Sequence, residues 1–169
     1  TATQLGTAMG LQVFTTAGSG EACAYCEALG AKRAINFKQD DFVSILREAG
    51  GADIILDIIG GDYVARNIKA ARADARIIQI AFNLGSKMEI DLMPVMLKRL
   101  TLTGSTLRSR PEAFKSAVAA DLQKIAWPFF DAAPAQSFAP SASSHSATGS
   151  GRGASSSSRQ SFTASDEQV

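Results

Sequence analysis

The chain has 169 residues, of which 46% are hydrophobic and 20% charged, a length and composition that fit one globular domain with an appendage. A formal net charge of +1 without long charge runs argues against a nucleic-acid-binding protein. No apolar run is long enough to span a bilayer and no secretory signal opens the sequence, so we expect a cytoplasmic protein without membrane attachment.

Up to about residue 130, short apolar segments rich in β-branched residues alternate with segments of helical periodicity. The chain opens inside an amphipathic helical pattern over residues 1–9, which ends at Gly10. Predicted strands then cover residues 11–16, 33–36, 53–58, 76–82 and 100–107. Predicted helices cover residues 21–29, 40–49, 62–71 and 92–98.

The ends of these helices carry recognisable signals. Asp40 and Asp62 stand where amino-terminal caps belong, and Gly30 and Gly50 stand where helices stop. Apolar strands that alternate with helices of this length are typical of parallel strands buried on both faces. We therefore predict that residues 1–130 form an α/β domain with a doubly wound parallel sheet.

This predicted domain begins with a helix and not with a strand. A helix followed by Gly10 and then a strand is the second half of a βαβ unit. The first strand and its glycine-rich phosphate turn would therefore precede Thr1. We expect a sheet that lacks its first strand.

The sequence changes character after Phe130. Residues 131–169 contain twelve serines, four of them in the run 155–158, and show no hydrophobic periodicity. Such a segment cannot bury enough apolar surface to offset the entropy lost on ordering, so we expect a disordered tail. The abrupt change also suggests a frameshift, which the DNA around codons 128–136 would test.

Two cysteines, Cys23 and Cys26, form a C-x-x-C pair on a predicted helix. A zinc site would need further ligands, and the single histidine, His145, lies far away in the tail, so we predict no metal site. A redox dithiol and plain packing against the sheet are both open, and packing is the preferred interpretation.

Three stretches together resemble a known family. They cover residues 4–42, 52–82 and 98–110, and their more specific parts read LDIIGGDY and LTGSTLR. The sequence resembles the cofactor domain of the zinc-free medium-chain dehydrogenases and reductases, in particular the quinone oxidoreductase branch of the zeta-crystallin type. In that family a separate, mostly β catalytic domain and a glycine-rich turn precede the segment that corresponds to Thr1.

The resemblance implies that NADP, as NADPH, is the cofactor. The turn Ala17-Gly18-Ser19-Gly20 follows the predicted strand 11–16, which corresponds to the second strand of the family. It lacks the acidic residue that would bind the ribose of NAD. Gly18 would allow close approach of a 2′-phosphate and Ser19 would supply a hydroxyl. Relatives place a Lys and a Tyr where this chain has Ala22 and Phe37, which weakens the preference and leaves NAD open. Phe37 would stack near the adenine or pack in the core, and Lys38 would supply a substitute charge.

The resemblance places the rest of the cofactor along the next two strand ends. Gly60 and Gly61 follow the predicted strand 53–58, which corresponds to the fourth strand of the family. There they would either let the backbone approach the cofactor or only permit a sharp turn. Ala81, Phe82 and Asn83 would lie beside the nicotinamide ring. We expect Asn67 on a helix surface, and Arg108 and Arg110 in solvent.

The sequence offers no catalytic triad or paired carboxylates, and we assign no catalytic residue. That absence fits hydride transfer, in which the cofactor carries the chemistry. The family implies reduction of a quinone or an enone by NADPH, with enoyl reductases and alcohol dehydrogenase-like enzymes as alternatives. A catalytically inactive remnant with a structural or oligomerising role is the other hypothesis. A homodimer would form through the strand at residues 100–107.

Overall fold

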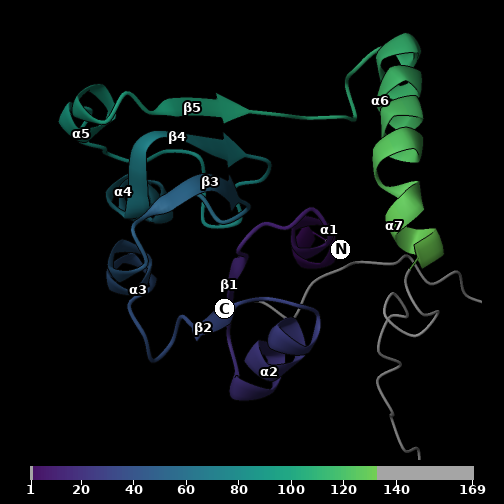
Figure 1. The fold of residues 1–169 in the computed structure, drawn as a ribbon. Coiled ribbons are helices and arrows are strands. Elements are labelled where there is room, and N and C mark those ends of the chain that lie inside the picture. Colours follow the sequence, from purple (N-terminus) through teal and green to yellow (C-terminus); the bar gives the residue numbers. More distant parts are fainter. Residues whose placement is uncertain (1, 133–169) are drawn as a thin grey trace, which may run out of the picture.

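The computed structural model describes residues 2–132, which form an α/β domain with five parallel strands and seven helices (Figure 1). The tail predicted for residues 131–169 lies outside this range from residue 133 onward. The helices are α1 (Ala2–Ala8), α2 (Gly20–Ala28), α3 (Phe42–Glu48), α4 (Tyr63–Ala70), α5 (Met93–Leu97), α6 (Glu112–Ile125) and α7 (Trp127–Ala132). The strands are β1 (Phe14–Ala17), β2 (Arg33–Asn36), β3 (Ala52–Asp57), β4 (Ala71–Gln79) and β5 (Thr101–Gly104).

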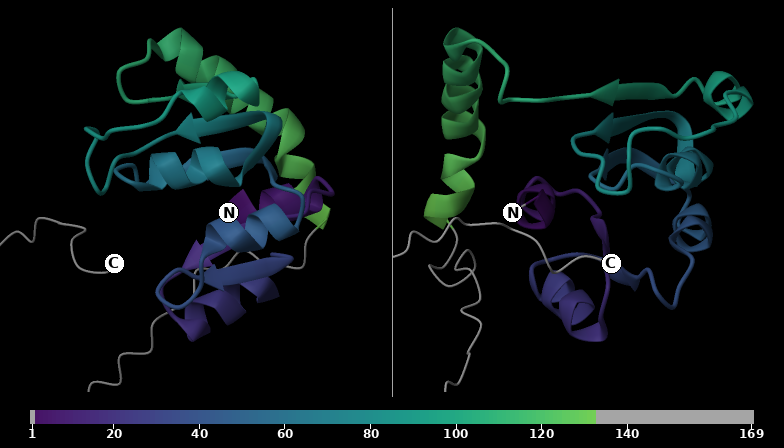
Figure 2. Two further views of the ribbon diagram at one scale, coloured as in Figure 1. Left: turned by 90° about the vertical axis from the view of Figure 1, so that its left-hand side faces the viewer. Right: turned by 180° about the vertical axis from the view of Figure 1, so that it is seen from behind.

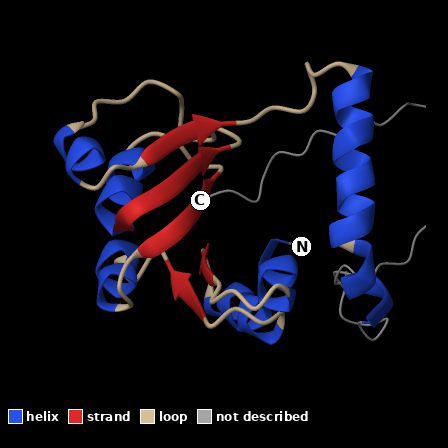
Figure 3. Ribbon diagram, turned by 45° about the horizontal axis from the view of Figure 1, so that its top comes forward, coloured by secondary structure: helices blue, strands red, loops and turns tan. Residues whose placement is uncertain are grey.

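The strands form two parallel sheets instead of one. One sheet has the order β1-β2 and the other the order β3-β4-β5, as Figure 3 shows. A complete doubly wound sheet has the order 3-2-1-4-5-6. If the five strands are counted as the second to the sixth of that sheet, the break falls where the first strand belongs. The structure thus confirms the predicted fold class.

Two clusters of buried side chains hold the helices against the strands. Val64 and Ile68 of α4 pack on Ala75 and Ile77 of β4. The second cluster links the two sheets, because Ile35 of β2 packs with side chains from α3 and α4; its members are Ile35, Phe42, Val43 and Ala70. The helices α3, α4 and α5 lie together along one side of the strands, whereas α2 packs on β1 and β2 (Figure 1).

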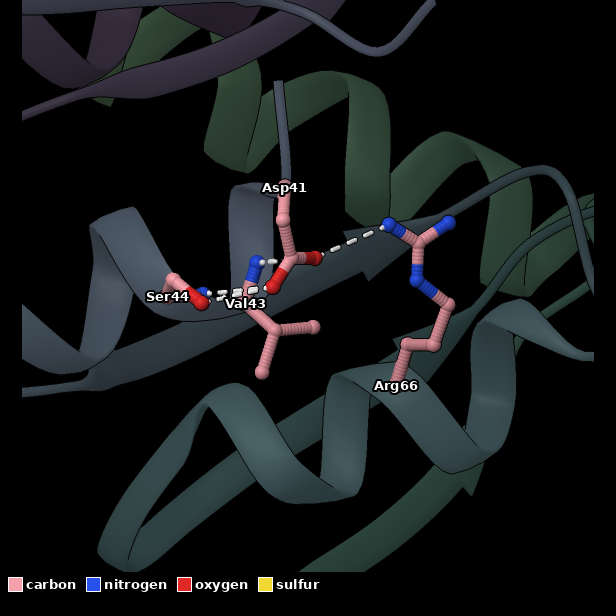
Figure 4. Close-up of polar contacts among 4 residues, drawn as sticks. All are labelled: Asp41, Val43, Ser44 and Arg66. Atoms are coloured by element: carbon pink, nitrogen blue, oxygen red, sulfur yellow. Dashed lines mark hydrogen bonds and ion pairs between the residues drawn. The ribbon is translucent and has the colours of Figure 1, made fainter. Parts of the chain in front are cut away.

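The cap of α3 differs from the prediction by one residue. Asp41, and not Asp40, has the extended backbone of a cap, and its carboxylate accepts the N–H groups of Val43 and Ser44 at 3.2 Å (Figure 4). Asp62 precedes α4 as predicted, but its side chain makes no capping hydrogen bond. The difference is physical, since a cap must lie at the point where the backbone changes from extended to helical.

Two further differences concern the second half of the domain. The strand predicted for residues 76–82 starts earlier, at Ala71, and the strand predicted for residues 100–107 is limited to Thr101–Gly104. The helices α6 and α7 were not predicted. Pro111 before α6, Glu112 in its first turn and Lys124 in its last turn are typical signals of a helix.

The long helix α6 stands apart from both sheets in Figure 1 and in the right panel of Figure 2. It contains no buried residue, and its apolar side chains Phe114, Leu122 and Ile125 are about half exposed. Much of the apolar side of α6 is therefore uncovered within residues 2–132, although the Arg110 guanidinium lies over the Phe114 ring. None of the described helices has the length and hydropathy to cross a membrane.

Candidate cofactor site

The turn after β1 and the end of β2 meet at one edge of the smaller sheet. Phe37 continues the pairing, since its N–H donates to the carbonyl of Ala17 at 3.1 Å. A Cβ atom placed on Gly18 would lie 3.2 Å from Cζ of Phe37 and 3.6 Å from Cε of Lys38. The predicted residues Gly18, Phe37 and Lys38 are thus brought together, with the ring and the lysine stem over the glycine backbone.

The other two residues of this turn, Ser19 and Gly20, form the amino end of α2. Ser19 has extended backbone, and its hydroxyl oxygen accepts the N–H of Ala22 at 3.2 Å, so it is the cap of the helix. No heavy atom lies within 4 Å of a Cβ placed on Gly20. The start of α2 therefore presents open space beside glycine backbone, an arrangement that favours an anionic group.

The second group of predicted residues lies at the ends of β3 and β4. The segment after β4 folds back over the turn after β3, because Asn83 N–H donates to the carbonyl of Ile58 at 3.2 Å and Leu84 N–H to that of Ile59 at 2.8 Å. In return Gly61 N–H donates to the carbonyl of Gly85 at 3.0 Å. Gly60 and Gly61 are thereby joined to Ala81, Phe82 and Asn83.

Gly60 and Gly61 both require glycine. Their φ angles are +72° and +54°, which side chains rarely tolerate. A Cβ on Gly60 would also lie 2.7 Å from Cδ1 of Phe82 and 2.8 Å from the carbonyl oxygen of Gly85. The space next to Gly60 is occupied by the chain itself, which supports the alternative that these glycines serve the turn.

Asp57, the last residue of β3, holds this turn from beneath. Its carboxylate is buried, with 3% of the residue exposed, and accepts the N–H groups of Ile59 at 2.6 Å and Gly60 at 3.0 Å. Its other oxygen accepts the side-chain amide of Asn67 at 2.8 Å. Asn67 is itself only 5% exposed, so the prediction that it lies on the helix surface is wrong. Asn67 lies on the buried side of α4, where its side-chain amide donates a hydrogen bond to the buried carboxylate of Asp57.

Gln79 ties the end of β4 into the same network. Its side-chain amide donates to the carbonyl of Asp57 at 3.2 Å and to that of Ala81 at 2.6 Å. Neither Gln79 nor Asn67 was predicted to have a role. The feature that could have drawn attention to Asp57 is its position as an acidic residue at the end of an apolar strand, three residues before Gly60-Gly61.

A third polar cluster joins the amino end of α3 to α4. Arg66 lies over the rings of Phe42 and Tyr63, with its Cζ 4.3 and 4.9 Å from their centroids. The same guanidinium contacts Asp41 at 3.2 Å. The Ser44 hydroxyl, assisted by two backbone N–H groups and Arg66, lowers the pKa of Asp41 to about 2 against the opposing effect of desolvation.

The amino ends of β3 and β4, at the opposite edge, carry positive charge. Lys98 donates to the carbonyls of Ile68, Lys69 and Ala71, at 3.0, 3.1 and 2.7 Å, and so caps the carboxyl end of α4. Burial and the nearby charge of Arg47 lower the pKa of Lys98. These cations balance the carbonyl ends of α3 and α4, so they have a structural explanation.

The environment of Cys23 favours its thiol form. Cys23 and Cys26 are both free and half-buried on α2. Burial, together with the neighbouring Cys26 and two carboxylates, raises the pKa of Cys23, whereas a reactive thiol has a lowered one. Within residues 2–132 no three His, Cys, Asp or Glu side chains lie close enough together to hold a metal ion.

The predicted residues thus form two groups, each at the carboxyl ends of its own pair of strands. Ligands of doubly wound proteins lie across these ends. The fold, with turns at the carboxyl ends of parallel strands, is that of a Rossmann-like domain.

Comparisons with known proteins agree with this class. A family model for zinc-binding dehydrogenases matches residues 1–123, and the chain belongs to that family. Quinone oxidoreductase-like protein 2 of Mus musculus is 26% identical over 96 residues, or 55% of this chain and 27% of the mouse protein. The aligned segment spans about a quarter of the length of that curated relative.

Two solved structures share the fold. The quinone oxidoreductase from Thermus thermophilus, solved also in complex with NADPH, gives a TM-score of 0.64 at 24% identity and covers 75% of this chain and 40% of its own. An NAD-dependent alcohol dehydrogenase gives a TM-score of 0.61 at 28% identity, and the match covers 76% of this chain and 37% of the alcohol dehydrogenase. The chain thus belongs to the zinc-binding dehydrogenase family and is similar, over part of its length, to quinone oxidoreductase-like proteins.

Proposed function

We propose that this chain is the cofactor domain of a zinc-free, NADPH-dependent quinone oxidoreductase-like enzyme. The observation that carries the proposal is the placement of the predicted cofactor residues at the carboxyl ends of β1 to β4. The nicotinamide would supply a hydride to a quinone or to the β-carbon of an enone. The protein's part is to bind and orient the cofactor.

Gly18, Ser19, Phe37 and Lys38 would hold the adenosine end. The amino end of α2 and the Lys38 ammonium favour a 2′-phosphate, and the Phe37 ring offers a face for the adenine. Glu21, in the first turn of α2, would instead favour a ribose hydroxyl. NADPH is the proposed cofactor, and direct comparison with NADH tests the choice.

Ala81, Phe82 and Asn83 would border the nicotinamide end, and Gly60 and Gly61 would shape the turn on which this segment lies. Phe82 is 48% exposed and can cover one side of a bound ring, while Asn83 supplies an amide in the same segment. No catalytic acid or base is assigned. Similarity to an alcohol dehydrogenase keeps related reductions, including those of enoyl substrates, as alternatives.

A second function from another class is favoured by the break between β1 and β3. The pyrophosphate of a dinucleotide is normally held by the turn after the first strand, which the described residues do not form. The chain would then be an inactive structural or oligomerising module. All four residues of β5 are exposed at a sheet edge, and we propose this edge as the place where two copies pair.

Titration of the purified chain with NADPH and NADH, followed by nicotinamide fluorescence, separates the two functions. Saturable binding with Kd below about 100 μM, or roughly 5.5 kcal/mol, supports the cofactor domain. A chain that is folded by circular dichroism but binds neither nucleotide supports the structural module. Size-exclusion chromatography with light scattering then tests pairing through β5.

A further inference from the structure

Among the described residues 2–132, no cationic side chain contacts the buried carboxylate of Asp57. It accepts three N–H groups, two from the backbone of its own turn and one from Asn67 of α4. The backbone carbonyl of the same residue accepts N–H groups from Ile80, at 2.9 Å, and from Gln79. One residue therefore connects β3, the turn after it, α4 and the end of β4.

This concentration of contacts is greater than strand pairing requires. A buried carboxylate is costly unless its hydrogen bonds are satisfied, so the turn must keep the shape that satisfies them. Gly60 and Gly61 accept that shape because they tolerate positive φ angles. The segment 80–83 is fixed in turn by its bonds to Asp57, Ile58 and Gln79.

We infer that Asp57, oriented by Asn67, is the positioning residue that sets the geometry of the turn 58–61 and the segment 80–83. The inference deepens the proposed function, because these two segments border the nicotinamide end of the site. Asp57 acts through the backbone that it holds, and it does not itself touch the cofactor.

Exchanging the two side chains tests the pairing. Asn67→Asp alone places two carboxylates where an amide now donates at 2.8 Å, so their repulsion should open the turn. Asp57→Asn combined with Asn67→Asp restores one acceptor, one donor and the original charge. The control is Asp53→Asn, which removes a carboxylate at the other end of β3.

Amide hydrogen exchange in the absence of cofactor is the primary measurement. Asn67→Asp should speed exchange at Ile59, Gly60 and Leu84 by about tenfold, the double variant should restore it, and Asp53→Asn should leave it unaltered. Unaltered exchange in Asn67→Asp, or no recovery in the double variant, overturns the inference.

NADPH titration of the same variants provides the functional readout. Asn67→Asp should raise Kd by about tenfold while the double variant returns it to near the original value. A loss of thermal stability without a change in Kd would show a merely structural network and overturn the positioning role. If the unmodified chain fails to bind NADPH, the proposed function fails, and the exchange experiment alone decides the inference.

Discussion

The guanidinium of Arg66 on α4 lies 3.2 Å from the carboxylate of Asp41 at the amino end of α3 (Figure 4). The Arg66 side chain also covers the stacked rings of Phe42 and Tyr63, whose centroids are 5.5 Å apart. Asp41 thus serves two purposes, as the cap of α3 and as the contact between two helices. Because Phe42 belongs to the cluster that links the two sheets, this pair supports the junction between them.

Asp41 should make stability depend on pH at the acid end. Its pKa is lowered from 3.8 to about 2 in the folded chain, so the folded state binds this proton less tightly than the unfolded state. The stabilisation is present above pH 4 and is lost as the pH falls toward 2. Thermal unfolding of the chain and of Asp41→Asn at several pH values should show a difference that shrinks in this window. Asp40→Asn, which removes the adjacent carboxylate that does not cap the helix, is the control.

Gly60→Ala should destabilise the chain more than a comparable change elsewhere. Gly60 has φ +72° and a Cβ there meets Phe82 and a backbone oxygen, whereas Gly10 has φ +78° and open space around it. We expect Gly10→Ala to cost about 1 kcal/mol and Gly60→Ala about 2 kcal/mol more, from overpacking. Urea denaturation of both variants measures the difference. Equal losses would contradict the contact between Gly60 and Phe82.

Lys98→Met should destabilise the carboxyl end of α4. The methionine keeps the aliphatic stem but removes an ammonium that donates to three carbonyls. We expect a loss of about 1–3 kcal/mol in the free energy of unfolding. The control is Lys115→Met. Lys115 donates to one carbonyl, that of Arg108, at an exposed site, so this variant should lose less free energy of unfolding. A loss no larger than that of the control would show that water replaces the Lys98 contacts.

Lys38→Gln should weaken binding of NADPH more than that of NADH. If the ammonium contacts the 2′-phosphate at an exposed site, its removal should raise the Kd of NADPH about fivefold and leave that of NADH nearly unchanged. The effect should shrink in high salt. Lys69→Gln removes a lysine in the last turn of α4, away from the proposed site, and is the matched control. A parallel loss for both nucleotides would place Lys38 away from the 2′-phosphate.

The sequence alone determined the local structure, because each element carries its own signals. The alternation of apolar and helical segments predicted β1 to β5 and α1 to α5. Phe37 and Lys38 after one strand, and Gly60 and Gly61 after another, were placed correctly at strand ends because strand ends can be read from turn residues.

The tertiary structure decided which of these residues meet. Asn67 has the polar side chain of a surface residue, and no local signal shows that a carboxylate from β3, ten positions earlier, lies beneath it. The same holds for Phe82, which fills the space beside Gly60. It also holds for Arg66 of α4, which contacts Asp41 at the amino end of α3. Such contacts join distant parts of the chain and depend on how strands and helices pack, so their energies appear only once the fold brings the partners together.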